Sequence, residues 1–157
     1  MSVKLHRKGI VINSNSDTLK IGSTNYYKRK AGQLVYGKQN LFNGAMAIIP
    51  DEFNGYLTSN DVPALDIDKF KVLPEYFIQY IGRPNYYKNL ETLSSGTGSK
   101  RIHEKTLFKI IESFPTIEEQ QKITDFLLVL DNRIDQTTRK VELLKDQKKW
   151  FMKQMFV

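Results

Sequence analysis

The sequence predicts an α+β protein in which a mixed-sheet domain is followed by one long C-terminal helix. Short apolar runs separated by turn residues fill the first part of the 157-residue chain, which is typical of strands. Apolar residues change to helical spacing from Pro74 onward. Residues 117–157 contain neither proline nor glycine, so one helix can run through them without a break. We therefore expect a domain over residues 1–115 and a helix over residues 116–157.

Five short runs in the first part predict strands. They combine β-branched and other apolar residues, and the first of them ends at the polar turn cluster 13–17. Short strands cut by turns favour a mixed, sheet-centred domain. The runs cover residues 9–12, 33–36, 45–49, 55–58 and 62–67.

Two shorter helices are expected before the long one. Tyr76, Phe77 and Tyr80 recur at helical spacing until Gly82, and a second short helix is favoured over residues 86–93. Apolar residues further along then return the chain to the core. They are Ile102, Leu107, Ile110 and Phe114.

The segment 94–101 contains no apolar residue. Its two glycines permit unusual backbone dihedrals and a close approach to a ligand. A solvated linker is the alternative interpretation, but linkers seldom end on a paired Lys100 and Arg101 followed by an amphipathic turn. We therefore treat the segment as a candidate binding loop.

The long helix has a clear start and an apolar seam. Thr116 with Glu119 three residues later is a capping box. A helix of about 39 residues extends roughly 58 Å, too long for a small domain to cover. Burial of the whole helix on the domain is the alternative, but we expect it to project and to pair with another helix. Alternating steps of four and three connect the apolar seam residues Ile123, Leu127, Leu130, Ile134, Val141, Leu144, Phe151 and Met155 with the polar Thr137 and Lys148, which can fix register.

The charge balance favours a polyanionic partner. The chain has 24 Lys and Arg against 17 Asp and Glu, a net charge of +7. Residues 1–50 hold eight basic side chains and one acid, and residues 83–115 form a second basic block, whereas residues 51–82 are acidic. A generic basic protein that binds no polyanion would have the same sum, so charge alone leaves both interpretations open.

Cations beside aromatic and amide side chains favour nucleic acid. In residues 26–30 and 83–88 tyrosines adjoin lysine and arginine, a mix suited to phosphates and base faces. The candidates for phosphate contact are Lys28, Arg29, Lys30, Lys38, Lys88, Lys100 and Arg101. The candidates for contact with base edges are Gln39, Asn40, Asn43, Ser99 and Arg101.

The residue types do not predict catalysis. The chain has no cysteine, which excludes a disulfide, a thiolate zinc site and a cysteine nucleophile. His6 and His103 cannot build a multi-histidine metal site by themselves, and residues 96–100 lack the spacing of a phosphate loop. Neither a membrane-spanning run nor a signal peptide is evident, so we expect a cytoplasmic binding protein without membrane, metal or cofactor.

The C-terminal motifs resemble the specificity subunit of type I restriction-modification systems. The match is carried by residues 96–102, by Glu119-Gln120-Gln121-Lys122-Ile123, by Leu130-Asp131 and by Lys148-Lys149, in this order. Residues 32–36, 55–60 and 76–80 are similar to weaker features of the family. The resemblance therefore spans nearly the whole chain.

The resemblance implies a non-catalytic DNA specificity protein. In that family a target-recognition domain reads one half of a bipartite duplex DNA site, and a long conserved helix follows it. A full subunit carries two such units, whose helices pair antiparallel and set the gap between the half-sites. The helices also help to dock two methyltransferase subunits, and restriction subunits join the assembly, so methylation and cleavage belong to these partners.

This chain departs from the family pattern because it has one recognition domain and one helix. Its first strand region enters the domain partway, without the N-terminal segment that the family leads us to expect. A half-subunit or a fragment both fit. A half-subunit would pair with a second copy about a two-fold axis and place two identical domains on a symmetric, interrupted site. The alternative is a coiled-coil adaptor that binds other proteins and no specific DNA.

Overall fold

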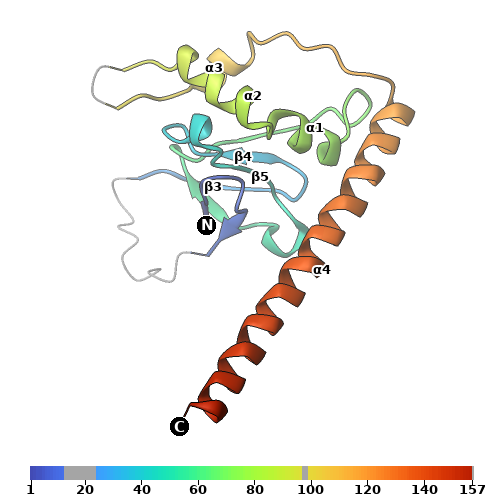
Figure 1. Ribbon diagram of the computed structural model, residues 1–157. Helices are drawn as coiled ribbons and strands as arrows, with labels where there is room; N and C mark the ends of the chain where they lie inside the picture. Colours follow the sequence, from blue (N-terminus) through green and yellow to red (C-terminus); the bar gives the residue numbers. More distant parts are fainter. Residues whose placement is uncertain (13–23, 97–98, 157) are drawn as a thin grey trace. The chain divides into compact units, whose positions relative to one another are not determined.

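The computed structural model describes residues 1–12, 24–96 and 99–156 (Figure 1). The chain forms two units, Met1–Gln120 and Gln121–Val157. The first is a mixed domain and the second is most of a long helix, which confirms the predicted α+β class. The predicted turn cluster 13–17 and the middle of the segment 94–101 lie outside the described residues.

All five predicted strand regions contain a strand. The described strands are β1 (Ser2–Val3), β2 (Ile10–Val11), β3 (Tyr26–Lys28), β4 (Leu34–Tyr36), β5 (Met46–Ile48), β6 (Leu57–Ser59) and β7 (Ala64–Leu65). Strands β1 and β3 were not predicted. They are only two and three residues long. Strand β1 is formed by pairing with β2 across a turn, and β3 by pairing with β6, which is distant in sequence.

A three-stranded antiparallel sheet in the order β5-β4-β7 lies at the centre of the domain. Leu34 pairs with Ile48 on one side and with Leu65 on the other. Successive side chains of a strand point to opposite faces, and here both faces are covered. Leu34 and Tyr36 belong to one buried cluster, whereas Val35 belongs to another.

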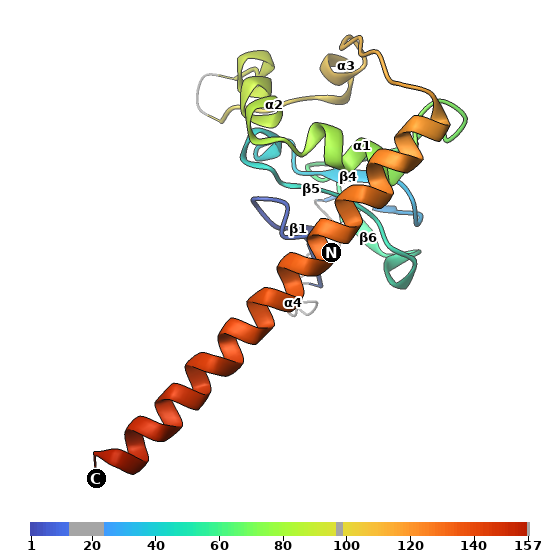
Figure 2. The ribbon, with the colours of Figure 1, turned by 45° about the vertical axis from the view of Figure 1, so that its right-hand side comes forward.

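The shorter helices cover one face of this sheet. Helices α1 (Pro74–Ile81) and α2 (Pro84–Asn89) lie over it in both views (Figures 1 and 2). The second helix begins two residues earlier than predicted, because Pro84 occupies its first turn, where a missing N–H costs nothing. The other helical elements are η2 (Leu41–Asn43), η3 (Asp51–Phe53), η4 (Leu90–Leu93) and α3 (Glu104–Leu107).

The long helix α4 spans Ile117–Met155, and its predicted capping box is present. The Thr116 N–H donates to Glu119 Oε2 at 3.0 Å, and the Glu119 N–H donates to Thr116 Oγ1 at 3.3 Å. These bonds satisfy donors that the first turn of a helix leaves free.

The first turn of α4 belongs to the domain, and Gln120 fastens it there. This side chain is fully buried. Its Oε1 accepts from the Leu73 N–H at 2.8 Å, and its Nε2 donates to Lys71 O at 3.0 Å and to Pro115 O at 2.9 Å. A buried amide with three partners ties the start of α4 to the loop before α1.

The apolar seam of α4 is exposed along the single chain. Among the predicted seam residues only Leu127 is half-buried, and Ile134 and Met155 are 61% and 72% exposed. The pairing of this seam with a partner helix stays a prediction. Among the described residues, the structure has no helix that is both long and apolar enough to cross a membrane.

Candidate nucleic-acid interface

The candidate binding loop is held against the domain by backbone hydrogen bonds. Ser95 and Arg101 pair antiparallel, each N–H donating to the carbonyl oxygen of the other at 2.9 Å. The next residue, Ile102, is fully buried, and its N–H donates to Lys38 O at 2.9 Å. The loop therefore emerges directly beside the end of β4 and the residues that follow it.

Four polar side chains meet at this point, and we call them the loop cluster: Gln39, Asp61, Ser99 and Arg101. Arg101 Nη1 lies 3.1 Å from Asp61 Oδ1. With the Gln39 amide oxygen turned toward the loop, it accepts from Arg101 Nη2 at 2.8 Å and from Ser99 Oγ at 3.2 Å. The fold thus brings together three residues that the sequence proposed for base contact.

Further candidates lie next to the loop cluster. Asn40 and Asn43 are exposed, and Asn43 Nδ2 donates to Asn40 Oδ1 at 3.2 Å. Helix α2, which carries the exposed Lys88, packs against η2. Lys100 Nζ forms an exposed ion pair with Glu91 Oε1 at 2.7 Å. Six predicted residues around one loop therefore bring amides, cations and a hydroxyl group to the surface, namely Gln39, Asn40, Asn43, Ser99, Lys100 and the half-buried Arg101.

Lys38 lies differently from the prediction. It is only 4% exposed, and its Nζ lies 3.1 Å from Glu104 Oε1 and 3.4 Å from Asn60 Oδ1. An ammonium group buried and paired in this way cannot reach a phosphate without breaking the pair. The structure therefore argues against Lys38 as a phosphate contact, because a sequence does not show which lysines are enclosed.

The ion pair between Lys38 and Glu104 is expected to make stability depend on acid pH. Burial alone would raise the pKa of Glu104, but hydrogen bonds from its backbone and from Lys38, together with the Lys38 charge, lower it below the ordinary 4.5. A carboxyl group whose pKa is lower in the folded protein than in the unfolded chain stabilises the fold at pH values above the unfolded-state pKa. This stabilisation is lost as the pH falls through the lower pKa of the folded protein. Glu104→Gln should cost about 2 kcal/mol of unfolding free energy at pH 7 and much less at pH 3.

Urea denaturation of wild type and variant at both pH values tests this expectation. Glu91→Gln is the matched control, because the ion pair between Glu91 and Lys100 is exposed on both sides and should contribute less than about 0.5 kcal/mol. If the two substitutions lower the unfolding free energy equally at pH 7, the buried ion pair stabilises the fold no more than the exposed one, and the expectation is wrong.

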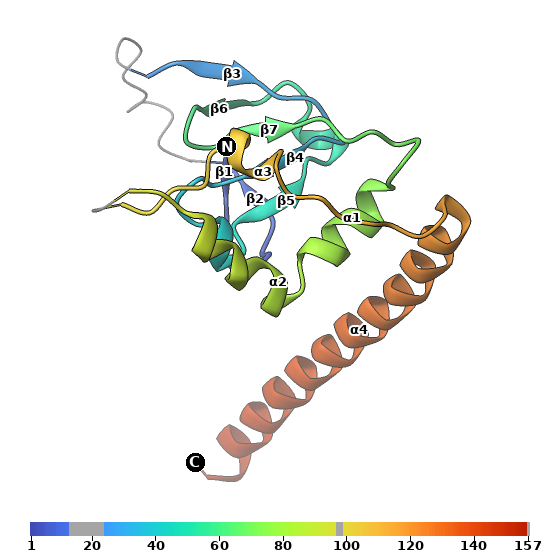
Figure 3. The same cartoon turned by 90° about the horizontal axis from the view of Figure 1, so that it is seen from above.

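The candidates in residues 28–30 form a separate group. Arg29 is used inside the domain, with Nε donating to Thr58 Oγ1 at 2.7 Å and Nη2 to Val62 O at 3.2 Å. Lys28 and Lys30 are exposed beside a shallow pocket that includes Asn54. Figure 3 shows strand β3 beside β6, with helix α2 on the other side of the domain. The predicted residues therefore form two groups, one on β3 and the residues that follow it and one around the loop cluster.

The acidic partners of the loop were missed by sequence reasoning. Asp61 and Glu91 face Arg101 and Lys100, although Asp61 belongs to the acidic block 51–82. Nothing in the local pattern marks these acids, because the contact depends on how distant segments fold together. Within the described ranges, no group of three or more His, Cys, Asp or Glu could hold a metal ion.

Comparison with known proteins gives consistent matches over most of the chain. Residues 5–146 match a family model described as the type I restriction modification DNA specificity domain. The specificity subunit of the type I restriction enzyme MjaVIII of Methanocaldococcus jannaschii is 25% identical over 154 residues, which are 98% of this chain and 31% of that protein. The HindI specificity subunit of Haemophilus influenzae is 26% identical over 131 residues, which are 82% of this chain and 28% of that protein.

A solved structure shares the fold. The crystal structure of the HsdS subunit from Thermoanaerobacter tengcongensis matches with a TM-score of 0.64 at 16% sequence identity, over 80% of this chain and 32% of that one. The chain thus spans about a third of the length of the proteins that it matches.

Proposed function

Because the chain belongs to the family of type I restriction modification DNA specificity domains, we propose that it reads one half of a bipartite duplex DNA site. The observation that carries this proposal is the loop cluster, in which Gln39, just after β4, meets Ser99 and Arg101 of a loop that backbone hydrogen bonds anchor at both ends. Arginine bonds guanine with two donors and glutamine bonds adenine in the same two-point manner. Sites of this kind gain precision when their support is rigid.

The neighbouring cations are proposed to hold the DNA backbone. Lys100 lies within the loop, the exposed Lys88 lies on α2, which packs against η2, and Lys28 and Lys30 form the second basic group. Phosphate contacts of this type position a duplex without reading its sequence. In the free protein Arg101 forms an ion pair with Asp61, and Lys100 forms one with Glu91. Exposed ion pairs are weak, so phosphates and base edges can replace the two carboxylates.

The helix is proposed to connect the recognition domain to partners. Two copies would pair their seams antiparallel, place two domains on a symmetric DNA site and present a docking surface to methyltransferase and restriction subunits. Recognition would then belong to this chain, while methylation and cleavage would belong to those subunits in the cytoplasm. The coiled-coil adaptor is the weaker candidate, because family membership and the exposed amides of the loop cluster both favour DNA.

Selection from a random duplex pool tests the proposal. We expect the purified protein to enrich an interrupted sequence with two related halves, and its affinity for that sequence to fall steeply as salt increases. An unrelated duplex of the same length is the control, since cations alone would bind it equally. Failure to bind any duplex at about 50 mM salt, where electrostatic binding is strong, would contradict the proposal.

A further inference from the structure

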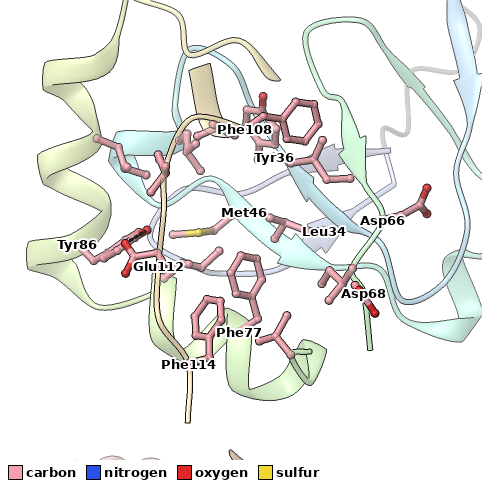
Figure 4. Close-up of a pocket in the computed structure, with 18 of the residues that line it drawn as sticks. Leu34, Tyr36, Met46, Asp66, Asp68, Phe77, Tyr86, Phe108, Glu112 and Phe114 are labelled. Carbon is pink, nitrogen blue, oxygen red and sulfur yellow. Dashed lines mark hydrogen bonds between the residues drawn. The ribbon is translucent and has the colours of Figure 1, made fainter. Parts of the chain in front are cut away.

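The domain contains an apolar cavity that the DNA-reading proposal does not use. It has a volume of about 490 Å³ and lies between the central sheet, helix α1 and the segment after α3 (Figure 4). Leu34, Met46, Phe77 and Phe114 line it. At its edge Ile111 is 93% exposed. Large apolar side chains turned to solvent beside an apolar cavity are typical of a surface that binds a partner.

The edge of this cavity is acidic. Asp66, Asp68 and Glu112 are the charged residues that line it. Figure 4 places Asp66 and Asp68 together at one edge, and Glu112 beside Tyr86. Glu112 accepts from the hydroxyl groups of Tyr80 at 2.7 Å and Tyr86 at 2.9 Å. Asp66 Oδ1 accepts from Gln33 Nε2 at 2.8 Å, and Asp68 Oδ2 lies 3.5 Å from Lys71 Nζ in an exposed ion pair. Exposed contacts of this kind are weak, so lysines of a partner can replace them. An apolar group flanked by cations would complement this surface.

The C-terminal end of α4 has the complementary chemistry. Trp150 is 57% exposed, and its ring lies 4.9 Å from that of Phe151. Met152, Met155 and Phe156 are exposed as well. Three lysines accompany these apolar side chains, namely Lys148, Lys149 and Lys153. We call residues 148–156 the helix tip.

The helix seam does not account for Trp150. Phe151 and Met155 lie on the seam, whereas Trp150 follows the seam position 148 by two residues and therefore turns away from a partner helix. Pairing of two helices would leave the Trp150 ring in water. A large aromatic side chain at this place needs a further apolar surface.

Antiparallel pairing would bring the helix tip of one copy to the start of α4 in the other. In full overlap of the seams Ile123 stands opposite Met155, and Leu127 stands opposite Phe151. Ile123 lies three residues, or about 4.5 Å, after Gln120. Gln120 is bonded to the loop at Lys71 and Leu73, and this loop includes cavity-lining residues. The helix tip would therefore arrive near the start of the partner's α4, the end of the helix that Gln120 bonds to this loop.

We propose that the helix tip of a second copy docks on this cavity, with Trp150 inserted and its lysines facing Asp66 and Asp68. The inference rests on the homodimer proposed above and extends it from the seam to the domain. Docking fixes each long helix at both ends, because its start is bonded to its own domain through Gln120 and its tip is held by the domain of the partner. The separation of the two recognition domains would thereby become constant.

Trp150 provides a direct measurement, because it is the single tryptophan of the chain. In the full-length dimer we expect blue-shifted emission and weak quenching by acrylamide. Charging the cavity edge with Phe108→Glu and Ile111→Glu should shift the emission to the red and raise the quenching constant severalfold. The mass measured by light scattering should remain that of a dimer, because the seam is intact. Both replaced side chains are exposed, and Leu93→Glu is the matched control on another exposed apolar residue of the domain.

Three outcomes would overturn the docking proposal and are distinguishable from one another. If acrylamide quenches Trp150 in the dimer as strongly as in a seam-disrupted monomer, the docking proposal is wrong, whereas pairing through the seam is retained. A wild-type protein that is monomeric removes both. Binding of the neutral probe N-phenyl-1-naphthylamine to the cavity, with Trp150 exposed in the dimer, would assign the cavity to a small apolar ligand. DNA affinity measured on the same samples reports separately on the proposed function, because the loop cluster does not include Trp150.

Discussion

Glutamate at both Leu130 and Leu144 is expected to convert a dimer of this chain into a monomer. In the antiparallel overlap Leu144 stands opposite Ile134, and Leu130 stands opposite Lys148. The two substitutions remove four leucines from the paired seam and add four carboxylates. Each buried leucine contributes about 2 kcal/mol, and each carboxylate at position 144, which faces Ile134 without a cation, costs several kcal/mol more. The association constant should therefore fall by many orders of magnitude.

Light scattering checks this result, because the monomer has a mass of 18.3 kDa. Val129→Glu with Leu143→Glu is the matched control. It adds the same charge at two exposed apolar positions that lie two residues beyond the seam positions 127 and 141 and face away from the partner. The control should remain dimeric, and circular dichroism should show equal helix content. A folded wild-type monomer would mean that the seam pairs with a different protein.

Replacement of Lys100 and Arg101 by alanine is expected to weaken DNA binding tenfold to a hundredfold. A two-donor contact from arginine to guanine contributes about 1–3 kcal/mol, and removing one phosphate-binding cation lowers the slope of affinity against salt by about 1. The salt dependence of the variant should accordingly be flatter. Fluorescence anisotropy with the selected duplex, measured at several salt concentrations, gives both quantities.

Two further variants separate charge from recognition. Lys69→Ala with Lys71→Ala removes two exposed charges outside the loop and should lower affinity only slightly. Arg101→Lys keeps the charge but loses the planar pair of donors, so it should reduce discrimination between sequences while the salt slope stays unchanged. Equal binding by wild type and by the variant lacking Lys100 and Arg101 would remove this loop from the DNA site.

Several features of the fold follow from local signals in the sequence. The alternation of Leu34, Val35 and Tyr36 between two buried faces agrees with a strand covered on both sides. Thr116 and Glu119 start the long helix by bonds between residues three apart, and an uninterrupted run of residues without proline or glycine lets it continue. Such signals involve neighbours along the chain, and for this reason the strand regions, the helix start and the seam could be predicted.

The loop candidates were only partly predictable. Cations and amides mark segments 26–43 and 94–101 as binding regions, but they do not show which side chains are free. Lys38 forms a buried ion pair with Glu104, and Arg29 donates a hydrogen bond to Thr58. Gln39 and Arg101, in contrast, contact each other at the surface. Each of these outcomes depends on a residue far away in sequence. The sequence shows how many cations a segment contains, whereas packing decides which of them are paired inside the domain and which stay exposed.

The sequence by itself therefore determined the class of the protein, five of its seven described strands, the regions of α1, α2 and α4, the apolar seam and the resemblance to a DNA specificity family. Tertiary structure alone decided the burial of Lys38, the meeting of the loop cluster, the anchoring of Gln120 and the apolar cavity. Gln120 shows the physical reason, because its amide bonds with Leu73, which is 47 positions away. Periodicity and capping report on residues within one or two turns, whereas contacts of this length form only when the whole chain packs.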